Sequence, residues 1–251
     1  MTRRRFFAPP GAFNANAKTV ILAGDESRHL RDVLRLARGD EVFVFDGNGN
    51  EYRCVVDEFG SNSSTLSLID KVEPASPESP LKLTLAVALL KGEKFDLVIQ
   101  KATELGVSLV VPVKTTRADI RLRDGADVQK RVARWQRIAL EAAKQSGRAF
   151  VPAVLSPTDF ASLLVDEQIA GTQRILFSER DGAPLQEMHL TAQPAGITAL
   201  VGSEGGWADE ELDQARQAGW KILTLGGRTM RAETAAISVT ALLQHLYGDL
   251  K

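Results

Sequence analysis

The sequence has few residues that could build a metal site or a covalent cross-link. Its 251 residues include a single cysteine, Cys54, and three widely separated histidines, His29, His189 and His245. One cysteine cannot form a disulfide within the chain or a thiolate zinc site, and the histidines lack the spacing of metal ligands. We therefore expect no bound metal.

Long apolar runs and an excess of charge of one sign are also missing. No segment approaches the roughly 20 apolar residues that cross a bilayer. The basic N-terminus is followed by an apolar stretch that is too short and too interrupted by proline for a signal-peptide core. These features predict a cytoplasmic protein without membrane contact. The formal net charge is -1, so RNA would have to bind local basic patches.

The proportions of apolar and charged residues, 44% and 25%, are ordinary for a globular protein, and the chain is long enough for two domains. Residues 71–80 contain three prolines and almost no apolar side chains, which is typical of a linker. We therefore predict two domains, residues 1–73 and residues 74–251.

The first domain has a mainly β pattern. Apolar or alternating segments predict strands at residues 19–22, 41–46, 52–59 and 65–72. The Gly-Asn-Gly-Asn sequence at 47–50 predicts a hairpin turn, and helical periodicity predicts a helix over 25–36 that Gly39 ends. Together these elements indicate a small barrel with one helix.

The second domain alternates between apolar strands and amphipathic helices. Strands are predicted at residues 81–90, 107–113, 174–177, 197–201 and 220–225. Helices are predicted at residues 94–105, 128–146, 157–169, 209–218 and 234–246. The apolar face of the last helix is expected to contain Ala235, Val239, Leu242, Leu243 and Leu246. Such alternation indicates an α/β fold with a parallel sheet covered on both faces.

Two glycine-containing loops follow strands of this predicted sheet, at residues 202–206 (Gly-Ser-Glu-Gly-Gly) and 225–235. Ligands of parallel sheets bind beyond the carboxyl ends of the strands, and glycine lets the backbone approach a ligand closely. A glycine-rich turn without function is the plain alternative for each loop alone. The presence of two such loops, the second with two arginines and a glutamate, favours a binding site.

The composition of these loops disfavours a phosphorylated ligand. Neither nucleotide-binding fingerprint is present. The helix after the first loop begins with Asp209, Glu210 and Glu211, and these carboxylates would repel a pyrophosphate at that helix end. S-adenosylmethionine carries a sulfonium cation and no phosphate, so it fits a loop that contains Glu204 better than NAD or ATP does.

The two loops resemble the signature of the SPOUT methyltransferases. Within that group the chain is similar to the RsmE family, which methylates N3 of a uridine in bacterial 16S ribosomal RNA. The resemblance covers nearly the whole chain and includes Arg5-Phe6-Phe7, Lys91-Gly92-Glu93-Lys94, residues 100–107, residues 141–148 and both loops. Ser203 departs from the pattern, because the family more often has proline there.

The resemblance implies a fold, a substrate and an assembly. The first domain would be a PUA-like β-barrel that binds RNA. The second would be a SPOUT domain, a trefoil-knotted, mostly parallel sheet with helices on both faces. The chain would form a homodimer with active sites at the subunit interface. Its substrate would be 16S rRNA, within an assembled 30S subunit, methylated at uridine position 1498 with S-adenosylmethionine as the donor.

The two loops, the basic patches and the resemblance together assign site residues. Donor binding is expected from Phe177, Gly202, Glu204, Gly205, Gly206, Leu225, Gly226, Arg228, Met230, Arg231, Thr234 and Ala235. RNA binding is expected from Arg3, Arg4, Arg5, Arg35, Lys94, Arg134 and Arg148. Basic residues of the predicted helix 128–146 and beyond also form a stripe, which is either an RNA contact or an ordinary solvated face.

The chemistry of uridine points to three catalytic candidates. The imide proton on N3 must leave before the nitrogen attacks the methyl group, and a positioned cation stabilises the resulting anion. Arg231 and Arg5 are the candidates for this cation, the latter only through the resemblance. Glu233 is the candidate general base, although capping of the last helix is an equally good interpretation.

Other functions stay open at this point. A SPOUT enzyme could modify another rRNA or tRNA nucleotide, a nucleotide-binding oxidoreductase could use a similar sheet, and an RNA-binding protein could keep the fold without catalysis. The oxidoreductase would be stabilised by NAD(P) rather than by S-adenosylmethionine.

Overall fold

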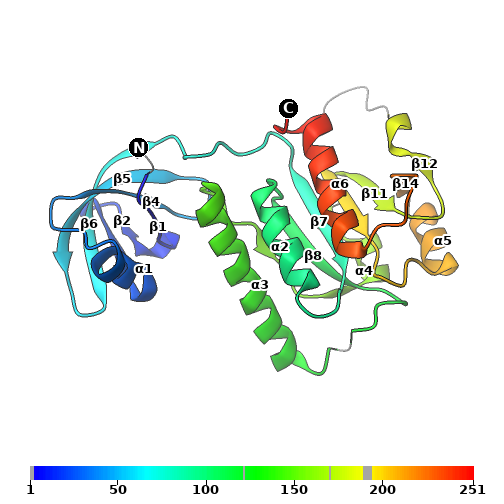
Figure 1. Cartoon of the computed structure of the whole chain (residues 1–251), viewed down its shortest axis with the longest axis horizontal. Coiled ribbons are helices and arrows are strands. Elements are labelled where there is room, and N and C mark those ends of the chain that lie inside the picture. The colour runs from blue at the N-terminus through cyan, green and yellow to red at the C-terminus, as the bar shows by residue number, and fades with distance from the viewer. Residues whose placement is uncertain (1–2, 121, 170, 189–193) are drawn as a thin grey trace. The chain divides into compact units, whose positions relative to one another are not determined.

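The computed structural model describes residues 3–120, 122–169, 171–188 and 194–251 (Figure 1). His189 lies outside these ranges. The chain forms two compact units, residues 1–78 with 140–151 and residues 79–139 with 152–251, and each is described separately. Among the described residues, no helix has both the length and the apolar content to cross a membrane.

The first unit contains a six-stranded sheet with the strand order β1-β4-β5-β6-β3-β2. Its elements are β1 (Arg5–Phe7), η1 (Pro10–Ala12), β2 (Phe13–Asn14), β3 (Thr19–Ala23), α1 (Gly24–Arg28), η2 (His29–Val33), β4 (Glu41–Phe45), β5 (Glu51–Phe59) and β6 (Ser63–Val72). All pairings are antiparallel except that of β1 with β4. Alternate strand residues, with Leu30 and Leu36, enclose a core around Phe6 and Cys54.

The hairpin predicted at residues 47–50 is confirmed, because β4 and β5 pair antiparallel across it and both of its glycines have positive φ, 81° and 93°. The predicted helix 25–36 is shorter. It changes from α to π geometry at His29 and ends at Val33, and Arg35 then adopts a positive φ of 51°. Strand β1 was not predicted, because three residues show no periodicity.

Buried Glu51 joins the strands of the first unit to the segment that follows β6. Its side chain is fully buried and pairs with Arg3 at 3.2 Å and with Arg5 at 2.9 Å. It also accepts a hydrogen bond from the Ala75 amide at 3.1 Å. The sequence suggested a linker here, but the backbone is hydrogen-bonded, since the Ser76 amide donates to the Gly147 carbonyl at 3.0 Å.

The end of helix α3 (Gly125–Ser146) belongs to this first unit. The Arg5 guanidinium donates to the carbonyls of Lys144 and Arg148, and a cation beside the last carbonyls of a helix is favourable. Lys144 pairs with Glu26, and Arg148 pairs with Glu78 at 2.6 Å. The basic side chains at this end of the predicted stripe therefore hold the unit together.

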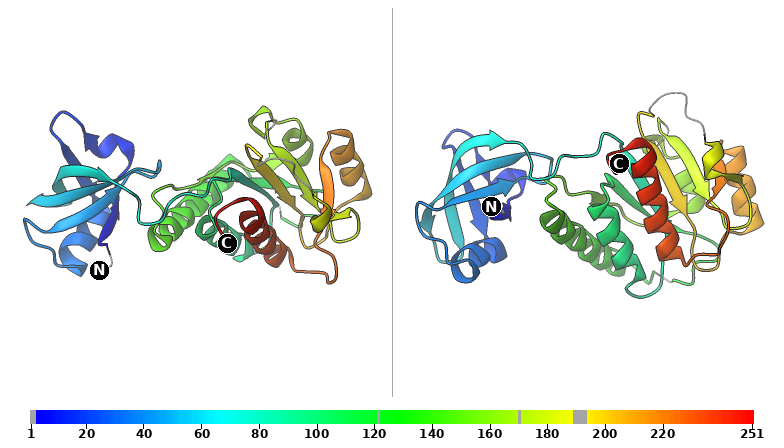
Figure 2. Two further views of the ribbon diagram at one scale, coloured as in Figure 1. Left: turned by 90° about the horizontal axis from the view of Figure 1, so that it is seen from above. Right: turned by 45° about the horizontal axis from the view of Figure 1, so that its top comes forward.

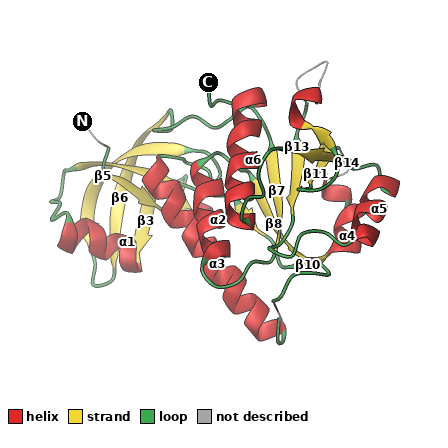
Figure 3. Cartoon of the chain, turned by 45° about the vertical axis from the view of Figure 1, so that its right-hand side comes forward, coloured by secondary structure: helices red, strands yellow, loops and turns green. Residues whose placement is uncertain are grey.

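The second unit contains an eight-stranded parallel sheet in the order β10-β8-β7-β13-β11-β14-β12, with β9 also paired to β8 (Figures 2 and 3). Its strands are β7 (Leu83–Ala88), β8 (Leu109–Lys114), β9 (Ala153–Val154), β10 (Thr158–Asp159), β11 (Gln173–Phe177), β12 (Ala183–Pro184), β13 (Ile197–Val201) and β14 (Lys221–Thr224). Its helical segments besides α3 are α2 (Lys94–Glu104), α4 (Phe160–Leu164), η3 (Glu167–Ile169), η4 (Leu185–Glu187), α5 (Asp209–Gln217) and α6 (Ala232–Tyr247).

Helices cover both faces of this sheet, as predicted. Helices α2 and α6 pack side by side on one face, where α6 contacts β7 and β13. Helices α4 and α5 pack on the other face around the buried Trp207 and Trp220. Strand β7 is buried at every position, which explains its unbroken apolar sequence.

Two predictions for this unit were wrong in part. Residues 157–169 do not form one helix, because β10, α4 and η3 share that segment. Val239 and Leu243 of α6 are buried, but Leu242 and Leu246 are 38% and 50% exposed. Small Ala236 and polar Thr240 and Gln244 face the protein instead.

Candidate active site

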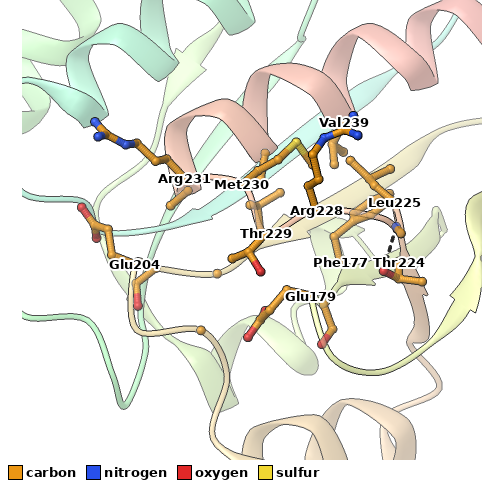
Figure 4. Close-up of a pocket in the computed structure, with 18 of the residues that line it drawn as sticks. Phe177, Glu179, Glu204, Thr224, Leu225, Arg228, Thr229, Met230, Arg231 and Val239 are labelled. Carbon is orange, nitrogen blue, oxygen red and sulfur yellow. Dashed lines mark hydrogen bonds between the residues drawn. The ribbon is translucent and has the colours of Figure 1, made fainter.

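A cavity of about 490 Å³ lies at the carboxyl ends of β13, β11 and β14, where parallel sheets bind ligands (Figure 4). The two predicted loops leave β13 and β14, and β11 runs between these strands. The end of β11 therefore supplies a third wall. All lining residues belong to the second unit.

Trp207 fixes the first loop, residues 202–206, against the end of β11. Its indole is 1% exposed, and its Nε1 donates to the Phe177 carbonyl at 2.8 Å. The indole packs against Gly202, where an added Cβ would be only 3.0 Å from the ring. A side chain at this position would therefore push against the buried tryptophan.

The first loop also contacts the segment after β8. A Cβ on Gly205 would lie 2.8 Å from the Arg117 carbonyl oxygen, so the two backbones approach closely. Buried Glu211 of α5 accepts hydrogen bonds from the amides of Thr116 at 2.8 Å and Ala208 at 3.0 Å. The acidic start of α5 thus holds two loops together and leaves no free helix end for a phosphate.

The second loop turns tightly after β14. Gly226 and Gly227 have φ values of 70° and 74°, which side chains rarely adopt. The Gly226 amide donates to the Thr224 hydroxyl at 3.1 Å, and the Arg228 amide donates to the Gly226 carbonyl at 2.9 Å. This turn carries residues 228–231 along the cavity to the start of α6.

Two carboxylates and two guanidinium groups line the cavity. Figure 4 shows Glu204 and Arg231 at one end and Arg228 at the other, with Glu179 beside the first loop. Within the described part of the chain, Arg231 has no hydrogen bond or ion pair to an acidic side chain. It occupies the N-cap of α6, where a helix dipole disfavours a cation. An unpaired arginine in such a place suggests a ligand partner.

Every residue predicted to bind the donor lines this cavity except Thr234, which is exposed on the first turn of α6. The lining members of that set are Phe177, Gly202, Glu204, Gly205, Gly206, Leu225, Gly226, Arg228, Met230, Arg231 and Ala235. Glu233 does not line it. Glu233 is 9% exposed, and one of its carboxylate oxygens lies 3.8 Å from the Lys94 ammonium.

The residues predicted to bind RNA fall into different surroundings. Arg4 and Arg35 are exposed. Arg3 and Arg5 pair with Glu51, Arg134 pairs with Asp96, and Lys94 pairs with Glu204. Arg148 is 4% exposed and paired with Glu78, so its burial argues against an RNA contact. RNA binding by these residues stays a prediction.

Several lining residues were not identified from the sequence, among them Ser178, Glu179, Thr224 and Val239. Ser178 and Glu179 directly follow β11, so the rule that placed the two loops would also have placed them. Ser203 is buried with no hydrogen-bond partner for its hydroxyl among the described residues. The RsmE family, which this chain resembles, more often has proline at this position, and proline would bring no unpaired hydroxyl.

Comparisons with known proteins decide the family. A family model described as RNA methyltransferase domain matches residues 77–244, and one described as RNA methyltransferase PUA domain matches residues 22–69. The ribosomal RNA small subunit methyltransferase E of Synechocystis is 35% identical over 98% of this chain and 78% of its own. The chain belongs to the ribosomal RNA small subunit methyltransferase E family.

Other members of the family agree over the full length. The Bacillus subtilis protein of the same name is 28% identical over 93% of this chain and 94% of its own. The crystal structure of the Neisseria gonorrhoeae protein, solved with bound S-adenosylmethionine, superposes with a TM-score of 0.86 at 32% identity and covers both chains completely. The predicted combination of a PUA domain with a SPOUT-type parallel sheet is thereby confirmed.

Proposed function

We propose that the cavity binds S-adenosylmethionine and that the protein methylates N3 of a specific uridine in 16S rRNA of the small ribosomal subunit. The cavity carries this proposal, because glycine loops from β13 and β14 and the end of β11 together enclose a space of ordinary ligand size. The relative from Neisseria gonorrhoeae, crystallised with this donor, supports it.

The residues present fit this donor. The two glycine loops line the cavity with backbone, which would bind the adenosine and methionine moieties. Glu204 and Glu179 bring negative charge to a ligand with a sulfonium cation. When bound, the donor supplies an electrophilic methyl group.

Arg231 is proposed as the principal catalytic residue. Its guanidinium would stabilise the negative charge that develops on the uracil ring as the N3 proton leaves. Glu233 adjoins Arg231 at the start of α6, but its carboxylate faces Lys94 rather than the cavity. Its role as general base stays a prediction, as does the catalytic role of Arg5.

RNA and subunit contacts complete the proposal. The PUA domain would bind RNA, and an assembled 30S subunit would be the substrate, which places the protein in the cytoplasm. A homodimer is proposed because Leu97 of α2, Leu242 and Leu246 of α6, and Leu250 beyond α6 are 38% to 50% exposed in one chain. The trefoil knot also remains part of the proposal.

The test is nucleoside mass spectrometry of 16S rRNA from cells with and without the gene. We expect 3-methyluridine to be lost in the deletion strain and restored by the intact gene. Unchanged 3-methyluridine with loss of a different methylated nucleoside would assign another target. No change in any methylated nucleoside would refute the proposal.

A further inference from the structure

Lys94 occupies an unfavourable position for a cation. It is the first residue of α2, where the helix dipole presents its positive end. Arg231 lies at the equivalent end of the neighbouring helix α6 and repels it further. A lysine that breaks a local rule in this way is expected to have a compensating partner or a functional reason.

The compensation comes from two carboxylates, one in the first donor-site loop and one at the start of α6. The Lys94 ammonium donates to Glu204 Oε1 at 2.9 Å, and Glu204 lines the cavity from the first loop. The same ammonium lies 3.8 Å from Glu233 Oε2, in the first turn of α6 directly after the second loop. That oxygen is buried and has no hydrogen bond among the described residues, so Lys94 supplies its counter-charge. One side chain thus connects the first loop to the helix that follows the second.

We propose that Lys94 is a positioning residue of the donor site, which holds Glu204 of the first loop and Glu233 at the start of α6 in place. The inference rests on the proposed binding of S-adenosylmethionine in this cavity. It differs from the RNA contact predicted for Lys94, because the ammonium is already engaged with carboxylates.

The charges around Glu204 give the proposal a pH signature. Partial burial alone would raise the pKa of Glu204, but the hydrogen bond from Lys94, with smaller backbone contributions from Glu204 itself and Lys91, holds its pKa below the ordinary value. Glu233 and Arg231 also face Lys94, and Arg117 contacts the adjacent Gly205. Lys94 therefore favours the ionised form of Glu204, and loss of Lys94 would shift the protonation of Glu204 to higher pH.

The experiment measures binding of S-adenosylmethionine to the full-length protein by calorimetry at pH 7.5 and pH 5.5. In Lys94→Met we expect binding about fivefold weaker at pH 7.5, a modest loss because the ion pair is partly exposed. The loss should increase at pH 5.5, whereas the wild type should bind equally at both values. Lys94→Arg should restore most of the affinity and the flat pH response.

Lys101→Met is the matched control, because Lys101 forms a similar ion pair with Glu104 on the same helix and does not line the cavity. It should bind like the wild type. Equal affinity of Lys94→Met and wild type at both pH values would overturn the proposal, as would a loss that is independent of pH. A wild-type protein that fails to bind the donor would instead refute the proposed function.

Discussion

The two arginines predicted to stabilise the uridine anion lie in opposite surroundings. The Arg5 side chain is 9% exposed, pairs with Glu51, donates to two carbonyls at the end of α3 and lies over the Phe45 ring. Arg231 is exposed, lines the donor cavity and has no acidic partner among the described residues. The contacts of Arg5 explain its presence, and those of Arg231 do not.

The difference separates two reasons for which an arginine occurs in a sequence motif. A buried guanidinium whose three nitrogens all donate hydrogen bonds stabilises the fold, and its removal leaves a buried carboxylate without its partner. An exposed guanidinium at a helix N-terminus lowers stability slightly, so a ligand is the simplest reason for it. Three substitutions test this contrast.

The largest effect is expected for Arg5→Ala. Breaking the buried pair with Glu51 should lower the free energy of unfolding by about 3 kcal/mol, because Arg3 alone cannot neutralise the buried carboxylate. Urea denaturation measures this change. Arg4→Ala, an exposed neighbour, is the control and should unfold like the wild type. An Arg5→Ala protein of normal stability that transfers no methyl group would make Arg5 catalytic and remove the contrast.

A smaller effect is expected for Arg231→Ala, and it should raise the activation free energy of methyl transfer rather than lower the free energy of unfolding. Loss of a preorganised cation should reduce methyl transfer to small subunits about 100-fold, while stability changes by less than about 0.5 kcal/mol. A radiolabelled methyl-transfer assay and a thermal melt measure the two quantities. Arg231→Lys should recover part of the rate. Near-normal turnover of Arg231→Ala would exclude the proposed role.

The smallest effect is expected on α3, where the same contrast recurs within one helix. Lys144 is paired with Glu26, whereas Arg137 is exposed and has no ion pair among the described residues. If this stretch of the stripe contacts phosphate, Arg137→Ala should weaken RNA binding about threefold. It should also reduce the slope of log affinity against log salt concentration by about 1. Arg216→Ala on α5 serves as the control. Identical salt dependence of both variants would assign α3 no RNA contact.

Much of the second unit could be predicted because its strands and helices have clear periodicity and its loops follow strand ends. The limits of that reasoning are physical. Periodicity places Leu242 and Leu243 on one broad apolar face of α6, but it cannot say which part of that face packs against the sheet. The burial of Glu51 was also out of reach, since the partners that neutralise it are Arg3 and Arg5, in and just before the short strand β1, which has no pattern of its own. Glu179 was within reach of the strand-end rule, but only the strand order, with β11 between β13 and β14, shows that it shares one cavity with the two loops.

A crystal structure of the full-length protein with S-adenosylmethionine tests the central claim most directly. The account predicts electron density for the donor against the end of β11, the glycine loop at 202–206 and the segment 225–231, with Lys94 still bonded to Glu204. Donor density elsewhere, or none at saturating concentration, would contradict it.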